Sequence, residues 1–173
     1  MKLKNDKKKF QYNITKHGLI TGFYFNYIIK NIYSLIDINK TVKVLDFGCG
    51  FGYLKKKLNK IKKIKIINYD IIDELTEIKD WKKINFDYLV STHVFMYLEK
   101  KELDKLLIDL KKCNQNLKMI VTISRQGLLN NIGKFILGEP EAHTGTRLNP
   151  NNQVKSLTKK MKIIKKKKHI IFK

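Results

Sequence analysis

Apolar residues follow two spacings along the chain. Short runs rich in Val, Ile and Leu are typical of buried strands. These runs occupy residues 41–46, 64–69, 86–90 and 119–123. Longer stretches carry their apolar residues at helical intervals. These stretches occupy residues 17–36, 53–60, 102–112 and 128–137. Alternating strands and helices are typical of βαβ units and a parallel sheet.

Three further stretches have weaker patterns. Asn149-Pro150 is typical of an N-cap and the first helical residue, and it predicts a helix from there toward Lys160. Residues 161–172 alternate apolar and lysine side chains poorly and favour one edge strand or a tight hairpin. Residues 71–81 are too few for a full strand and helix, so they hold an abbreviated third strand or none.

A glycine-rich turn follows the first predicted strand. Residues 42–54 read VKVLDFGCGFGYL, with glycines at positions 48, 50 and 52. Glycine lets the backbone turn sharply and lets a ligand approach more closely than a Cβ allows. The spacing G-x-G-x-G differs from the dinucleotide fingerprint G-x-G-x-x-G. A surface turn without a ligand is the alternative.

The residues VLDFGCGFG resemble motif I of the class I S-adenosylmethionine-dependent methyltransferases, whose typical form is [V/I]-L-D-x-G-C-G-x-G. The acid before the turn, the cysteine between glycines and the third glycine all match. The resemblance implies a three-layer α/β/α Rossmann-like fold with a mainly parallel central sheet and S-adenosylmethionine as cofactor. It also implies that the helix over 17–36 covers the substrate side of the pocket, and plain core packing is the alternative for this helix. The chain is short for both strands of the family's closing hairpin, so fewer than seven strands are expected.

The resemblance implies a set of cofactor-binding residues around the glycine turn. The loop would pack against the methionine and ribose portions of the cofactor through Gly48, Cys49, Gly50 and Gly52. Asp46 would order this loop or meet the amino group.

Asp70 follows the second strand, where a carboxylate can accept two hydrogen bonds from a ribose diol. The alternative is that Asp70 only caps a turn. Asp80 and Trp81 would flank the adenine, and plain core packing is the alternative for Trp81. Thr92 follows the strand at 86–90 and should face the pocket.

Histidines are the candidate bases, because imidazole titrates near neutral pH and a hydroxyl acceptor benefits from a general base. The candidates are His17, His93 and His143. His93 lies at the expected carboxyl edge of the sheet, and a histidine that only bonds the backbone is the alternative.

Three residues are candidates for substrate binding. Tyr24 lies on the predicted helix at 17–36, and Arg125 follows the fifth strand of the family pattern. Arg147 ends a polar loop from residue 138 that contains no lysine, and its guanidinium would suit a carboxylate or phosphate. An exposed loop with an incidental arginine is the alternative.

Composition adds a strong positive charge to this picture. The formal net charge is +22, but among 37 basic residues only Arg125 and Arg147 are arginines. Nucleic-acid readers rely on arginine forks, so dispersed lysines favour a solvated surface over a nucleic-acid site. The two cysteines form no C-x-x-C or metal spacing, and no apolar run is long enough for a membrane span. We expect one cytoplasmic domain over 1–173 with a flexible basic arm at 1–10, and leave its oligomeric state open.

Two missing motifs narrow the acceptor. The strand at 86–90, the fourth of the family pattern, is not followed by Asn/Asp-Pro-Pro-Tyr. No Pro-Cys pair supplies a nucleophile that could attack cytosine. These absences favour a small-molecule or glycan-type acceptor, methylated on oxygen with a histidine base. The alternatives are a methyltransferase directed at RNA or protein and a non-catalytic cofactor-binding module.

Overall fold

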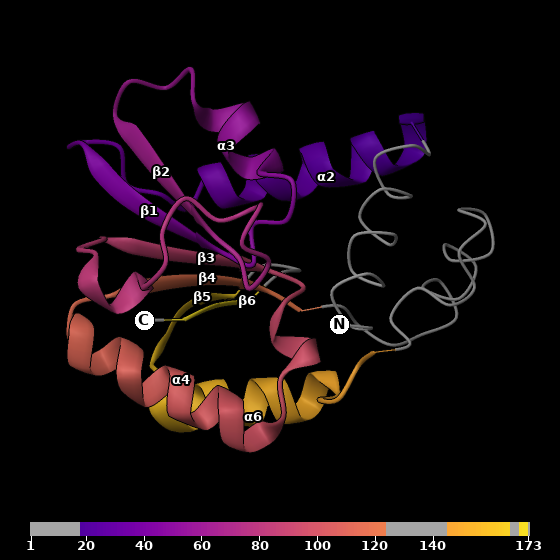
Figure 1. Ribbon diagram of the computed structural model, residues 1–173, viewed down its shortest axis with the longest axis vertical. Coiled ribbons are helices and arrows are strands. Elements are labelled where there is room, and N and C mark those ends of the chain that lie inside the picture. The colour runs from indigo at the N-terminus through magenta and orange to yellow at the C-terminus, as the bar shows by residue number, and fades with distance from the viewer. Residues whose placement is uncertain (1–17, 124–144, 167–169, 173) are drawn as a thin grey trace.

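The computed structural model describes residues 18–123, 145–166 and 170–172. Within them, a six-stranded sheet has the order β2-β1-β3-β4-β6-β5. Figure 1 shows α2 and α3 over one face of this sheet and α4 and α6 over the other, which gives three layers. The strands are β1 (Val42–Phe47), β2 (Ile64–Tyr69), β3 (Tyr88–Thr92), β4 (Lys118–Thr122), β5 (Ile163–Lys166) and β6 (Ile170–Phe172). The helices are α2 (Gly18–Tyr33), α3 (Tyr53–Leu58), α4 (Lys100–Cys113) and α6 (Pro150–Lys160), with 3-10 turns η1 (Trp81–Lys83) and η2 (Phe95–Tyr97).

Alternation along β1 explains why both faces are covered. Val42 and Val44 pack with α2 and α3, whereas Leu45 and Phe47 pack with α4 and α6. All four are at most 9% exposed. Side chains of successive strand residues point to opposite faces, so a strand with apolar residues on both faces is stable only between two helical layers.

The order in which successive strands are added to the sheet reverses at β1, because β2 lies on one side of it and β3 on the other. This strand is parallel to β2 on one side and to β3 on the other. The carboxyl ends of β1 and β3 therefore meet at a topological switch point, which is where open α/β sheets bind ligands.

Most predicted elements are confirmed within the described ranges, and the helix expected at 128–137 lies outside them. No strand forms between β2 and β3, a stretch that is described throughout, so the sheet has fewer than seven strands. The closing hairpin is present in full: β6 lies antiparallel between β4 and β5. The strand expected at 86–90 lies two residues later, at Tyr88–Thr92.

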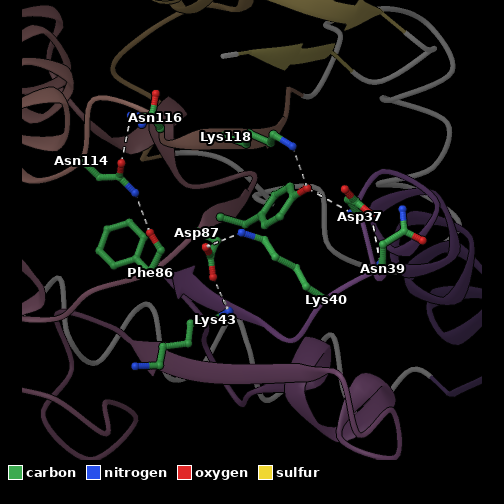
Figure 2. Close-up of polar contacts among 10 residues, drawn as sticks. Asp37, Asn39, Lys40, Lys43, Phe86, Asp87, Asn114, Asn116 and Lys118 are labelled. Carbon is green, nitrogen blue, oxygen red and sulfur yellow. Dashed lines mark hydrogen bonds and ion pairs between the residues drawn. The ribbon is translucent and has the colours of Figure 1, made fainter.

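A polar network joins the amino ends of β1, β3 and β4 (Figure 2). The glycine turn follows the opposite, carboxyl end of β1. The backbone N–H of Asp37 donates to the Tyr88 hydroxyl over 3.0 Å, and Lys118 Nζ donates to it over 3.4 Å. Asp87 accepts a 2.9 Å bond from the Lys43 backbone N–H. These bonds hold the loop after α2 against β1, β3 and β4.

No helix in the described part of the chain is long and apolar enough to span a bilayer.

Candidate functional site

The turn after β1 has a left-handed backbone at every second residue. Gly48, Gly50 and Gly52 have φ values of 76°, 54° and 68°. A Cβ on Gly48 would lie 2.3 Å from Val94 Cγ2, and one on Gly52 would lie 2.8 Å from Asn68 Nδ2. Glycine is therefore required at these two positions by backbone conformation and by the close approach of the segments after β3 and along β2. Whether the turn also contacts a cofactor stays a prediction.

Asp70 joins the end of β2 to this turn. Its Oδ2 accepts a 3.0 Å hydrogen bond from the Gly50 backbone N–H, and its Oδ1 accepts a 3.1 Å bond from the Ile72 N–H. The residue is 6% exposed. The carboxylate thus caps a turn, as the alternative held, and also points toward the glycines. An ionised carboxylate has about four acceptor positions, so two remain for a diol.

Asp46 is a buried acid beside this pair. It is 4% exposed, and no residue within the described ranges donates a hydrogen bond to its carboxylate. Burial, followed by the negative charges of Asp70 and Glu77, raises the pKa of Asp46 to about 7. A cation placed nearby would offset this unfavourable burial of charge.

Cys49 faces the segment after Asp70. Its thiol donates to the Leu75 carbonyl over 3.4 Å and to the Gly50 carbonyl over 3.5 Å. Burial raises the pKa of this thiol, and the charges of Asp46 and Asp70 raise it further. The side chain therefore stays a neutral thiol, unsuited to nucleophilic attack.

Asp80 and Trp81 have structural roles here. Asp80 Oδ1 accepts a 3.0 Å bond from the Lys82 N–H and caps η1. Trp81 is 6% exposed, and its ring meets Phe47 edge-on at 6.1 Å between centroids. The core-packing alternative for Trp81 is favoured because the buried indole has little surface to offer an adenine. A contact of Asp80 with a ligand remains a prediction.

His93 and Tyr24 come together although 69 residues separate them. The Tyr24 hydroxyl lies 2.9 Å from His93 Nε2, and the two rings are stacked with an interplanar angle of 13°. Burial raises the pKa of Tyr24, so its hydroxyl stays protonated. A phenol that donates to Nε2 requires the ring proton to be on Nδ1.

The backbone of His93 is unusual and held in place. Its φ is 56°, and it is the one described non-glycine residue with a positive φ. Its N–H is shared between the Thr122 carbonyl at 3.3 Å and the Thr122 hydroxyl at 3.2 Å. Such conformations are enriched at functional sites. Thr92 precedes it at the end of β3 and is half-buried.

Arg147 lies on the surface beside η2. Its N–H donates to the Met96 carbonyl over 2.8 Å, and its guanidinium is 3.6 Å from Glu99. Both side chains are largely exposed, so this ion pair contributes little to stability. The three other predicted site residues, His17, Arg125 and His143, lie outside the described residues.

The sequence did not single out Val94, Asn68 or Glu77. Val94 packs on Gly48, and Asn68 reaches Gly52. Glu77 bonds the backbone of Asn68 in both directions. The only sequence signal for these contacts is the pair Gly48 and Gly52. Glycine indicates that another segment packs closely against the backbone there, but it does not identify the residue that packs.

Comparison with solved structures identifies proteins that share this fold. No family model and no curated protein matches the chain. Mycolic acid cyclopropane synthase, solved with S-adenosylhomocysteine and CTAB, matches with a TM-score of 0.61 and 12% identity. Magnesium protoporphyrin IX methyltransferase from Synechocystis, with bound S-adenosylhomocysteine, matches with a TM-score of 0.55 and 14% identity. Human N-acetylserotonin methyltransferase in complex with S-adenosylmethionine matches with a TM-score of 0.57 and 16% identity.

The chain has the class I methyltransferase fold. The matches cover 85%, 85% and 83% of this chain, but only 64%, 78% and 49% of the three neighbours. The expected three-layer Rossmann-like arrangement is thus confirmed. At this level of identity the likeness concerns the fold alone.

Proposed function

We propose that this chain is an S-adenosylmethionine-dependent methyltransferase that acts on a small-molecule or glycan-type acceptor. One observation carries the proposal: at the switch point of the sheet, the Asp70 carboxylate bonds the Gly50 N–H beside the buried Asp46. Two acids and a bare backbone turn are suited to a ligand with a sugar diol and a positive charge.

The residues present fit this cofactor. Asp70 has acceptor positions left for both ribose hydroxyls. Burial disfavours the charged form of Asp46, and a ligand's amino group beside it would favour that ionised form. The glycine turn offers main chain without side chains at Gly50. When bound, S-adenosylmethionine supplies a methyl group made electrophilic by its sulfonium.

His93 is the proposed base for an oxygen acceptor. Its Nε2 already accepts from a hydroxyl, that of Tyr24 at 2.9 Å, when the ring proton is on Nδ1. An acceptor hydroxyl that takes the place of the Tyr24 hydroxyl would pass its proton to Nε2 while its oxygen forms a bond to the methyl carbon, and the S–CH3 bond would break to leave a neutral thioether. The partly exposed ring of Tyr24 would then line the acceptor side and help to exclude water.

The named neighbours support the acceptor class. Two of them are methyltransferases of N-acetylserotonin and of magnesium protoporphyrin IX, which are small molecules. We extend this class to the present chain, with oxygen as the acceptor atom.

Calorimetry on the purified full chain tests the proposal. S-adenosylhomocysteine should bind with a single site, and a nicotinamide dinucleotide should not. Binding of the dinucleotide alone, or of neither ligand, would reject the cofactor assignment and the methyltransferase activity with it.

A further inference from the structure

At the outer edge of β2, the backbone groups of Asn68 bond Glu77, and the Thr76 hydroxyl also donates to the Asn68 carbonyl over 3.5 Å. No described strand pairs with this edge, because the chain reverses after Asp70 and returns toward β2. Glu77 N–H donates to the Asn68 carbonyl over 3.0 Å, and Asn68 N–H donates to Glu77 Oε2 over 3.1 Å. Glu77 thus satisfies both backbone groups of Asn68, as a neighbouring strand would.

The same carboxylate reaches a second element. Glu77 Oε1 lies 2.5 Å from Lys55 Nζ on α3, the helix that begins directly after the glycine turn. The side chains of Lys55 and Glu77 are 31% and 41% exposed. A partly exposed ion pair contributes little, so the bond to the buried Asn68 backbone is the stronger restraint.

The loop closed by Glu77 carries Asp70. Between Asn68 and Glu77, Asp70 bonds Gly50 N–H, and Leu75 accepts from the Cys49 thiol. Both contacts go to the glycine turn. A loop fixed at its closing point and at two inner points has few ways to move, so Glu77 limits where the Asp70 carboxylate can lie.

We propose that Glu77 is a positioning residue that replaces the absent third strand and fixes Asp70 for its ligand. Its effect on the position of Asp70 comes from hydrogen bonding to Asn68 and not from its charge. The inference rests on the proposed function for the identity of the ligand, but the restraint on the loop can be measured without any ligand.

Two substitutions separate hydrogen bonding from charge. Glu77→Gln keeps the length and an acceptor oxygen but loses the charge, whereas Glu77→Asp keeps the charge but is too short to reach Asn68 N–H. Asp109→Asn is the matched control, because Asp109 forms a 2.6 Å ion pair with Lys82 outside this loop. Each full-chain variant is titrated with S-adenosylhomocysteine, and hydrogen exchange at residues 68–72 is measured without ligand.

The proposal predicts opposite results for the two variants. Glu77→Asp should weaken binding about 5–10-fold, the equivalent of one lost hydrogen bond, and should speed exchange at Asn68 and Ile72. Glu77→Gln should stay within about 2-fold of the wild type in both measurements, as should Asp109→Asn.

Several outcomes would overturn it. Weaker binding in Glu77→Gln with normal binding in Glu77→Asp would show that charge is what matters. Unchanged binding and exchange in Glu77→Asp would show that the restraint is not needed. If the wild type does not bind S-adenosylhomocysteine, the proposed function fails, and the exchange data alone then decide the role of Glu77.

Discussion

The acidic and phenolic side chains at the two ends of the parallel strands have different hydrogen-bond and charge partners. The amino edge is the end at which β1, β3 and β4 begin, and the carboxyl edge is the end at which β1 and β2 lead into the glycine turn and Asp70. At the amino edge, Asp87 accepts from the Lys43 N–H and lies 3.9 Å from Lys40 Nζ, while the Tyr88 hydroxyl has two donors (Figure 2). At the carboxyl edge, neither Asp46 nor Asp70 forms an ion pair with any lysine or arginine that the structure describes.

This difference is informative because the chain carries 37 basic residues. Lysines are abundant at the surface, yet two neighbouring buried acids lack a cationic partner within the described ranges. Burying charge without a partner costs stability, and such arrangements are typical of sites that are completed by a ligand. The acid at the amino edge lies near a lysine, whereas the two acids at the carboxyl edge have no such partner among the described residues, so we expect a ligand to complete that edge.

The largest expected effect concerns His93 at the carboxyl edge. His93→Ala should lower the rate of methyl transfer about 10²–10⁴-fold, because a general base typically contributes that much. The affinity for S-adenosylhomocysteine should stay unchanged. Single-turnover rates with an acceptor found by screening, together with calorimetry, check both parts. An equal loss in rate and affinity would make His93 a cofactor or structural residue.

Substitution of Gly48 tests whether the carboxyl edge depends on a bare backbone. Gly48→Ala should destabilise the fold by about 2–4 kcal/mol, through its left-handed backbone and the clash with Val94. Gly22→Ala on α2 is the control, since a Cβ there meets nothing within 4 Å. Urea denaturation measures both. A Gly48→Ala protein as stable as Gly22→Ala would contradict the described geometry of the turn.

Alanine substitutions of one aspartate at each edge, Asp70 and Asp87, compare the two edges directly. Asp70→Ala should weaken S-adenosylhomocysteine binding by about 1–3 kcal/mol through the loss of charged hydrogen bonds. Asp87→Ala should lower the free energy of unfolding but leave this affinity unchanged, because Asp87 lies at the other edge. Calorimetry at one salt concentration compares the two variants, and equal affinities for both would remove Asp70 from the ribose site.

A last prediction concerns a pH dependence from Asp46. Its pKa is raised to about 7 in the folded protein, chiefly by burial, so the folded state binds a proton more tightly than the unfolded state does. Stability from this group is therefore greatest at low pH, falls as the pH rises from about 4 to about 7, and is level above that.

Asp46→Asn should remove this slope. Urea denaturation of wild type and variant at several pH values between 5 and 8 measures it, and parallel curves for the two proteins would contradict the assignment. Ligand binding should show the reverse trend and strengthen toward pH 7, because an ionised Asp46 attracts a cationic amino group.

Periodic elements were predictable from the sequence and irregular ones were not. The strand Ile64–Tyr69 was predicted at its observed bounds, since its apolar residues alternate and an acid follows. The start of β3 was predicted two residues early, because Phe86 is apolar and buried without joining the sheet.

The contacts in the site were likewise predictable where they involve regular strands and not where they involve irregular segments. Asp70 beside the glycine turn was expected because the carboxyl ends of parallel strands meet at one edge. The bond between Tyr24 and His93 depends on where α2 crosses the sheet, which no local pattern encodes. Glu77 was missed because residues 71–77 have no periodicity, and its partner is set by the path of the reversed chain.

The position of β6 has a consequence for how the protein is made. Strand β5 is synthesised first, but it joins the sheet only through β6, which pairs with β4 on its other side. Nascent chains on the ribosome must therefore hold β5 unattached, and keep one side of β4 open, until Phe172 has left the exit tunnel. During that interval the exposed edge of β4 is open to pairing with other chains, which favours aggregation.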